Sequence, residues 1–493
     1  MKMTVADMKA MEERMIGDLP WLSPIGALVL AAVIAIVLAL VLPRRRQGLV
    51  GAWVAGAHLA AAALAAAVWM DRGFARVLEG TVMVDGLALT LTGIVGIGGA
   101  LCVGLARPML AGTDREGEFY AVLAASSLGA VVLGSAADAA LLAIALGLLS
   151  LTSFIMTGYL RHSERGNEAS LKYYIYGTVA GAVMVYGLTF WFGIAGTTDL
   201  AAVGRAVAGA PDAVVIASTA LVVVGLAYKA SLVPFHFWTP DVYDGAPLPV
   251  AAYLSVLPKL AGLIALARVL PTALPDGAVG WPTAIAILAA VTMTLGNLAA
   301  LAQSNVVRLL AYSSIAQAGY LLMGVAALSG SPQGIPALVY YAIAYAVTNI
   351  AAFAVVIAVQ RERDSVDLRA FAGLGRRHPW WTATLILSLL SLVGIPPLSG
   401  FVGKLEVFSA AIDAGQAWLA AIAVVNTVIS LFYYLRVIAP AVLDAPDDAP
   451  PATTAGRPLN AVLGLATAAT VVVGVAAEPL LWLAERSVPL AIS

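Results

Sequence analysis

The sequence has one cysteine, Cys102, which excludes a disulfide framework and a cysteine-ligated cluster. Charge is also scarce: Asp, Glu, Lys and Arg make up 11% of the 493 residues, whereas 61% are hydrophobic. A soluble domain of this length needs many more charged groups on its surface. The composition therefore excludes a soluble enzyme and indicates an all-α polytopic membrane protein.

The first twenty residues are too polar to form the core of a signal peptide. We treat residues 1–20 as a polar N-terminal extension, and two interpretations of it stay open. It forms a short helix at the membrane interface, or it lies upstream of a true start near Met15.

Apolar runs long enough to span a bilayer recur from residue 21 to the C-terminal region. The seventh and twelfth runs contain prolines and should be discontinuous helices. The stretch 405–440 should hold the second half of the twelfth span and then the thirteenth. We expect about fourteen transmembrane helices, at residues 21–42, 49–69, 87–110, 119–137, 139–160, 170–194, 213–240, 248–270, 281–302, 305–328, 334–360, 380–403, 405–440 and 458–482.

Lysine and arginine are distributed unevenly between the two sets of loops. Loops after odd-numbered spans carry about sixteen of them, and loops after even-numbered spans carry roughly four, at Arg72, Arg76, Arg205 and Arg268. Because short basic loops stay on the cytoplasmic side, odd-numbered loops should be cytoplasmic and both termini should lie outside.

Two distant segments share one arrangement: an apolar run, a proline, a short polar stretch and a second apolar run. One surrounds Pro234, and the other surrounds Pro396 and Pro397. Paired interruptions of this kind indicate a transporter built from inverted repeats. We therefore divide the rest of the chain into N-terminal helices (21–118), a first five-helix repeat (119–270), a second, inverted repeat (281–440) and a C-terminal helix (458–493).

Lysines lie inside three apolar spans, at Lys229, Lys259 and Lys404. Lys229 precedes the helix-breaking Pro234 by five residues, and a broken helix at membrane depth needs protein or a water-filled cavity to bond its free backbone groups. Burial disfavours the charged form of lysine, so such a side chain can exchange protons near neutral pH. The alternative is a structural charge paired with a carboxylate, which has more weight for Lys404 because Glu406 follows it.

Lys259 is the deepest of the three lysines. It lies eleven residues from either end of its span, about 16 Å at ~1.5 Å per residue, which is too far to reach water fully. Pro258 should break the helix locally and free the carbonyl of Leu254.

Other polar positions allow two interpretations each. His236 relays protons between Lys229 and the following loop, or it packs or caps. Asp138 is the N-cap of the fifth span, which we favour, or it is part of a proton entry. No ligand spacing predicts a metal site.

The tenth span has a polar face, which could hold a water chain or make hydrogen bonds between helices. The residues of this face are Tyr312, Ser313, Ser314, Gln317 and Tyr320.

Five motifs resemble those of the antiporter-like membrane subunits of respiratory complex I, the proton-translocating NADH–quinone oxidoreductase, and of its subunit N in particular. The resemblance covers the third to the thirteenth span, and its second long motif is highly specific. The motifs are EGEFYAVL (117–124), GYLRHSERGNEASLKYYIYG (158–177), AYKASLVPFHFWTPDVYDGAPLPVAAYLSVLPKLAG (227–262), GNLAALAQSNVVRLLAYSSIAQAGYLLMG (296–324) and GIPPLSGFVGKLEVFSAAI (394–412).

The resemblance implies a fourteen-span subunit of the membrane arm, in a bacterial inner membrane among other membrane-arm subunits, with no nucleic-acid partner. NADH, FMN, iron–sulfur clusters and quinone would be bound by partner subunits and not by this chain. Buried lysines of the family on spans 7, 8 and 12 match Lys229, Lys259 and Lys404. They would form a polar axis that couples electron transfer elsewhere to proton translocation.

The sequence departs from the family in two places. Gly147 stands where the family has a glutamate on span 5 that would pair with Lys229, and Gln317 stands where relatives commonly carry a histidine. Two alternatives therefore stay open beside the complex I subunit. One is a homologous subunit of a membrane-bound hydrogenase or of a multi-subunit cation/proton antiporter, and the other is a complex I scaffold with weakened proton conduction.

Overall fold

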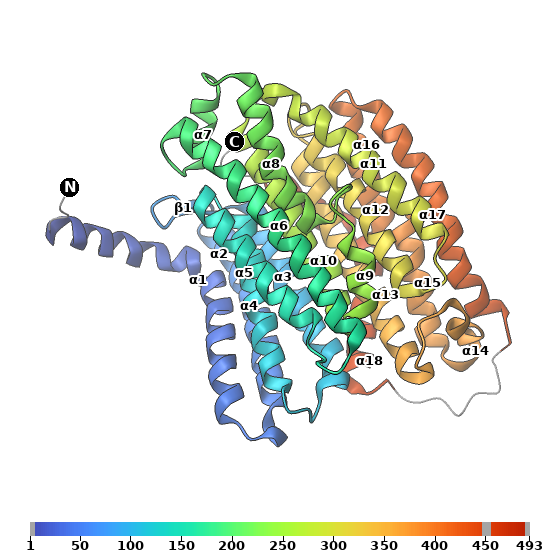
Figure 1. Ribbon diagram of the computed structural model, residues 1–493. Helices are drawn as coiled ribbons and strands as arrows, with labels where there is room; N and C mark the ends of the chain where they lie inside the picture. The colour runs from blue at the N-terminus through green and yellow to red at the C-terminus, as the bar shows by residue number, and fades with distance from the viewer. Residues whose placement is uncertain (1–4, 446–454, 489–493) are drawn as a thin grey trace.

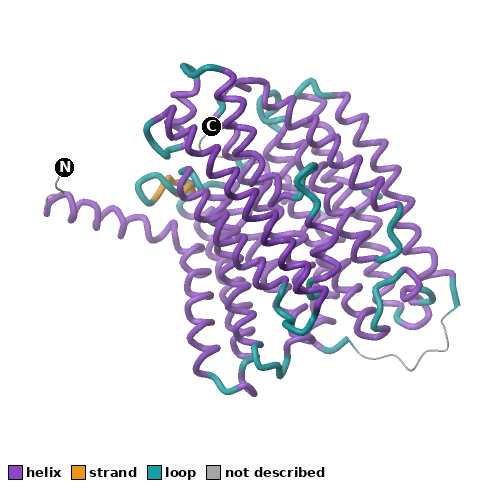
Figure 2. Tube along the Cα trace, in the orientation of Figure 1, coloured by secondary structure: helices purple, strands orange, loops and turns teal. Residues whose placement is uncertain are grey.

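The computed structural model describes residues 5–445 and 455–488, and it is helical almost throughout (Figure 2). Within these residues thirteen helices are long and apolar enough to cross a membrane. A shorter apolar helix, α15 (Pro379–Val393), is followed after an interruption by α16 (Ser399–Asp413), and the two together make one further crossing. Across the described residues the chain therefore has the mostly helical architecture of about fourteen spans that the apolar runs predict.

The N-terminal helices lie to one side of the bundle. α1 (Val5–Val41) begins in the polar extension and continues through Pro20 and Pro24 into the first span. Its first part projects away from the bundle (Figure 1). After η1 (Arg44–Arg46) and α2 (Gly48–Asp71), a short antiparallel hairpin of β1 (Ala75–Val77) and β2 (Val82–Val84) leads into α3 (Gly86–Leu110). The sequence patterns did not predict this hairpin.

The next seven helices cover the proposed first repeat and include α7, a short helix absent from our predicted spans. The seventh predicted span is interrupted between α8 and α9, as its proline predicted. Their bounds are α4 (Glu116–Ser135), α5 (Ala139–Thr157), α6 (Glu164–Ala195), α7 (Leu200–Val207), α8 (Asp212–Ala230), α9 (Trp238–Gly245) and α10 (Leu248–Ala273).

The second half of the bundle follows a short 3-10 turn, η2 (Pro275–Gly280). Besides α15 and α16 it consists of α11 (Trp281–Leu301), α12 (Val306–Ala326), α13 (Gly334–Arg363), η3 (Leu368–Phe371), α14 (Leu374–Arg377) and α17 (Ala417–Leu443), and it is followed by α18 (Arg457–Val475) and α19 (Ala477–Glu485).

α10 is the most enclosed helix of the bundle. Every residue in its most apolar 18-residue stretch is buried by protein, and α12 and α13 are almost as enclosed. Polar side chains on α10 therefore face other helices and not lipid. Close packing elsewhere depends on small residues: a Cβ added at Gly296 of α11 would lie 2.6 Å from the backbone nitrogen of Ala316 on α12.

The continuity of α10 corrects one prediction. The helix runs through Pro258 without interruption, so the helix break that we predicted at this proline is wrong. Proline removes one backbone donor, but helices enclose α10 on all sides and restrain its path.

A buried ion pair joins α10 to the start of α3. Both terminal nitrogens of Arg268 donate to the carboxylate of Asp85, at 2.6 and 2.7 Å, and its Nε donates to the carbonyl oxygen of Gly134 at 2.9 Å. Both side chains are fully buried. Arg268 is therefore part of the helix packing, whereas our count of loop charges had placed it in a loop.

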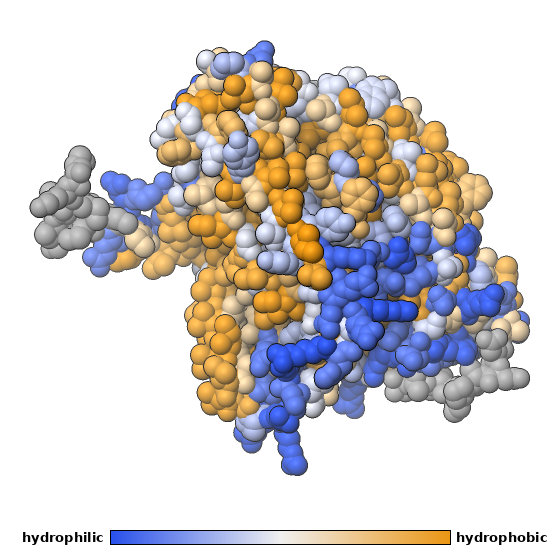
Figure 3. All heavy atoms as spheres, viewed as in Figure 1, coloured by the Kyte–Doolittle hydropathy of each residue, from blue (hydrophilic) through white to orange (hydrophobic). Residues whose placement is uncertain are grey.

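The surface of the bundle is divided by polarity. Figure 3 shows hydrophobic residues over the flanks and hydrophilic residues gathered in the lower part of the view. Such a division fits a protein whose flanks face lipid and whose loops face water.

Candidate functional site

The interruption after α8 is bonded by protein groups. α8 ends at Ala230, Ser231 has left-handed backbone geometry, and Pro234 follows in the connection to α9. The Val233 amide donates to the Thr292 hydroxyl at 3.1 Å, and the Trp238 indole donates to the carbonyl of Tyr228 at 3.1 Å. The backbone groups that the break exposes thus find partners inside the bundle, as a break at membrane depth requires.

Lys229 lies in the last turn of α8 and is 1% exposed. Its Nζ donates to the Ser150 hydroxyl on α5 and to the Tyr173 hydroxyl on α6, both at 3.3 Å. The ammonium also lies 5.3 Å from the centre of the Tyr173 ring. Among the described residues Lys229 therefore has neutral hydrogen-bond partners and no carboxylate.

Lys259 lies in the middle of α10 and is fully buried. Its Nζ donates to both the carbonyl oxygen and the hydroxyl of Ser314 on α12, at 2.9 and 3.0 Å. These partners are neutral, as they are for Lys229.

The last turn of α8 packs directly on α10, close to Lys259. A Cβ added at Gly262 would lie 3.1 Å from the backbone nitrogen of Ala230 and 3.3 Å from the Cβ of Lys229. Gly262 is three residues, or nearly one helical turn, after Lys259. The backbones that carry the two lysines are therefore adjacent.

A glutamine connects the surroundings of Lys259 to the second interrupted helix. Gln317 follows Ser314 by three residues on α12, accepts a hydrogen bond from the Tyr341 hydroxyl, and donates to the carbonyl of Leu392 at 2.9 Å. Lys404 on α16 donates to the next carbonyl, that of Val393, at 2.8 Å.

Lys404 completes the series and is also buried. Its Nζ lies 3.4 Å from the Thr427 hydroxyl and 4.2 Å from the centre of the Tyr320 ring. The interruption at Pro396 and Pro397 ends α15 at Val393, which places its last carbonyls beside Lys404 and Gln317. We call Lys229, Lys259, Ser314, Gln317 and Lys404 the lysine row.

Two of the predicted residues lie outside this row. His236 is 6% exposed in the connection between α8 and α9, and its Nδ1 makes no hydrogen bond within the described part of the chain. Tyr312 is half-buried on α12, and its phenol bonds to none of the residues that the structure describes.

Gly147 lies on an exposed side of α5, and no atom lies within 4 Å of a Cβ added there. The residue that reaches Lys229 from α5 is Ser150, three positions later. Gly147 is therefore an open position three residues before the serine that reaches Lys229. Asp138 is the N-cap of α5, as predicted, because its carboxylate accepts from the amides of Ala140 and Leu141.

Several residues of the site were missed by the sequence analysis, namely Ser150, Tyr173, Tyr341 and Thr427. Tyr173 lies inside the motif at 158–177, but nothing in the spacing of these four residues indicates which helix faces which. Among the described residues no three His, Cys, Asp or Glu side chains are grouped closely enough to hold a metal ion.

Ion pairs fix the short helix α9 on the far side of the interruption. The Asp241 carboxylate accepts from Lys172 of α6 at 2.8 Å and from Arg308 of α12 at 2.9 Å. Asp244 accepts from the amide of Asn305 at 2.7 Å. The two ends of the broken helix are therefore held by different contacts: neutral groups at Lys229 and charged groups at Asp241.

Discontinuous helices beside buried lysines, within a fourteen-span bundle, define a transporter-like membrane subunit. The transmembrane family described as NADH:quinone oxidoreductase/Mrp antiporter matches residues 136–430, and the chain belongs to that family.

The chain is similar over most of its length to "NADH-quinone oxidoreductase subunit N 1" of Streptomyces griseus, at 42% identity over 88% of this chain and 90% of the relative. Among solved structures it matches a chain of respiratory complex I from Thermus thermophilus with bound aureothin. That match has a TM-score of 0.80 and 33% identity, and it covers 94% of this chain and 100% of the other.

A chain of the Mrp complex from Dietzia superposes with a TM-score of 0.84 at 24% identity, over 95% of this chain and 97% of the other. This likeness shows that the two chains share a fold.

Proposed function

We propose that this chain is the antiporter-like subunit N of a bacterial proton-translocating NADH–quinone oxidoreductase. In that role it is a membrane-arm subunit without redox chemistry, and its partner subunits bind NADH, FMN, the iron–sulfur clusters and quinone. Support comes from the similarity, over most of the chain, to a protein named subunit N and to a chain of a complex I structure.

The lysine row is the observation that carries the proposed mechanism. Three buried lysines follow one another through α8, α10, α12 and α16. Burial of a lysine among neutral groups is costly, and such residues in membrane proteins are characteristic of ion pathways. In our proposal each lysine accepts a proton and releases it along the row while electrons pass through other subunits.

The two interrupted helices support an inverted repeat of five helices in each half. Each half has its interruption in the fourth membrane crossing, at α8–α9 and at α15–α16. The lysines differ in placement: Lys229 precedes its break, whereas Lys404 follows the other. We propose that the halves are 119–270 and 281–440, with the second copy inverted in the membrane.

The test is proton pumping by the purified complex in proteoliposomes, with NADH and a soluble quinone. Lys259→Met removes the charge and keeps the side-chain volume, so the subunit should still assemble. We expect NADH-driven proton uptake to fall at least roughly tenfold, since a side chain without a titratable group cannot pass a proton. Arg205→Met on the exposed surface of α7 removes one positive charge elsewhere and should pump normally.

The same measurements separate the alternatives. Wild-type pumping by both Lys259→Met and Lys229→Met, in an assembled complex, would show a scaffold and overturn the lysine pathway. Subunits of a hydrogenase or of a cation/proton antiporter in the purified assembly, in place of NADH-oxidising subunits, would overturn the complex I assignment.

A further inference from the structure

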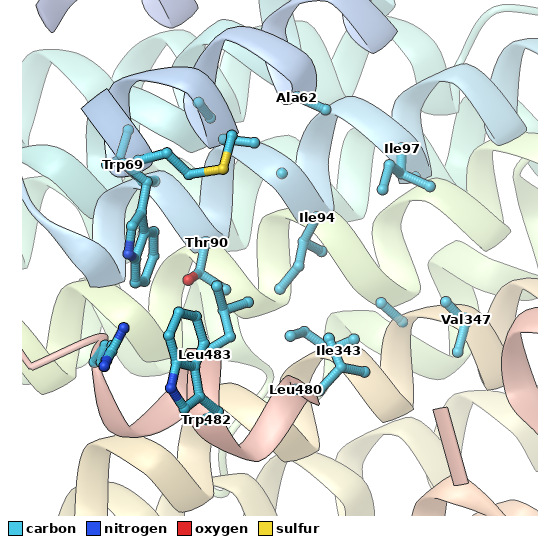
Figure 4. Close-up of a pocket in the computed structure, with 18 of the residues that line it drawn as sticks. Ala62, Trp69, Thr90, Ile94, Ile97, Ile343, Val347, Leu480, Trp482 and Leu483 are labelled. Atoms are coloured by element: carbon cyan, nitrogen blue, oxygen red, sulfur yellow. The ribbon is translucent and has the colours of Figure 1, made fainter. Parts of the chain in front are cut away.

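A large apolar groove lies between α2, α3, α13 and α19, away from the lysine row. It encloses about 650 Å³. Its walls include small residues such as Ala62, Ala66 and Gly93, whose missing side-chain volume leaves the space open. Figure 4 shows Ile94, Ile97 and Val347 among the residues that line it.

The groove has the depth of one leaflet. On α3 it extends from Leu89 to Leu101, which are twelve residues apart and span ~18 Å at ~1.5 Å per residue. Half of a ~30 Å hydrocarbon core is about 15 Å. A chain entering at one membrane interface would therefore reach the bilayer centre within this groove.

The mouth of the groove differs in chemistry from its depth. Trp69, Trp482 and Thr90 line it (Figure 4), and Arg486 lines it as well. The guanidinium carbon of Arg486 lies 3.8 Å from the centre of the Trp482 ring, and Arg486 is exposed without an ion-pair partner among the described residues. Tryptophans favour the membrane interface, and a guanidinium there is suited to a phosphate.

A transmembrane helix is about 10 Å across, whereas this groove is left open by the missing side chains of small residues such as Ala62, Ala66 and Gly93. A single hydrocarbon chain is thin enough to enter. The apolar depth and the cationic mouth together match an amphiphile with one long chain inside and an anionic group at the surface.

We infer that this groove binds one phospholipid, with an acyl chain between α3 and α13 and its phosphate at Arg486. The bound lipid fills a space that the packed helices leave open between the N-terminal helices and α13. An anionic headgroup binds more tightly than a zwitterionic one, because no carboxylate of the described residues neutralises Arg486.

Photolabelling tests this site in the purified complex in nanodiscs of phosphatidylcholine. The probe is a trace of phosphatidylglycerol with a photoreactive group near the end of one acyl chain. We expect labelled peptides from residues 94–101 and 343–350. No atom lies within 4 Å of a Cβ added at Gly93, so the side chain of Gly93→Leu should occupy open space in the groove. The substitution should reduce this labelling roughly tenfold, which corresponds to the binding free energy of about two buried methylene groups of the acyl chain.

The matched control is Gly181→Leu on α6, which also enters open space but lies outside the groove. It should leave the labelling unchanged. If Gly93→Leu prevents assembly, Ala66→Leu fills the groove from α2. Unchanged labelling of 94–101 in an assembled groove-filling variant would overturn the inference.

The headgroup is tested separately. A phosphatidylcholine probe should label the groove about two- to fivefold less than phosphatidylglycerol, the range of an exposed charge pair, and Arg486→Gln should remove that difference. Equal labelling by both probes in the wild-type complex would overturn the contact between the phosphate and Arg486.

Discussion

Replacing Gly147 by glutamate should increase the fraction of Lys229 that carries a charge. Residues three apart on a helix are neighbours about 5–6 Å apart at Cβ, so this glutamate would lie beside Ser150, whose hydroxyl is 3.3 Å from the Lys229 Nζ. No atom lies within 4 Å of a Cβ at this position, so the helix packing should tolerate the side chain.

The size of the effect follows from the distance. With the carboxylate about 5 Å from the ammonium and an effective dielectric constant near 20, the attraction is about 3 kcal/mol. That energy changes the ratio of charged to neutral lysine by about two orders of magnitude. The present partners of Lys229, two hydroxyl groups and an aromatic ring, supply no full negative charge.

Proton pumping as a function of pH is the measurement. Lys229 should stay charged to higher pH in Gly147→Glu, so the alkaline decline in pumping should move upward by up to about two pH units. Gly181→Glu on α6 is the matched control, since it places a carboxylate in equally open space away from Lys229.

The double variant Gly147→Glu/Lys229→Met isolates the pair interaction. An unchanged pH profile in Gly147→Glu, or the same shift in a background that lacks Lys229, would refute the reasoning. A structure of the assembled complex with a neighbour's carboxylate bonded to Lys229 would show that the missing partner is supplied by another subunit.

Two further predictions concern packing and orientation. Arg268→Leu should destabilise the subunit by about 3–5 kcal/mol, because it leaves the Asp85 carboxylate buried and unpaired; thermal unfolding of the complex measures this, and Asp85→Asn in the same chain should restore part of the loss. Tags in the 360–379 loop and at the C-terminus should be cut by protease on opposite faces of oriented vesicles, with the loop cytoplasmic. A cytoplasmic C-terminus would contradict the orientation.

The positions of the spans could be predicted because apolar runs of membrane length leave few alternatives. The interruptions at Pro234 and at Pro396–Pro397 were predictable as well, since proline in a polar stretch ends a helix. Pro258 misled us because the same residue inside an enclosed helix leaves the helix continuous. Local sequence does not record how tightly a helix is surrounded.

Partners of the buried charges could not be predicted. Asp85 and Arg268 are 183 residues apart, and only the packing of α3 against α10 brings them together. Ser314 and Gln317 were among the polar residues of the tenth span, but their contacts with Lys259 and Leu392 depend on helix rotation. A helix with one polar face can pack that face against any of several helices, so the sequence pattern does not identify the partner.

The carbonyl ends of the two interrupted helices have a consequence for how the lysines respond to charge. Lys229 occupies the C-terminal turn of α8, and Lys404 bonds to the last carbonyl of α15. A helix C-terminus carries roughly half a negative charge in its backbone dipoles. Unlike a carboxylate, this charge cannot be cancelled by a proton, so it changes only when the helix end moves or water enters. A shift of either half-helix would therefore change the partial negative charge that lies beside its lysine.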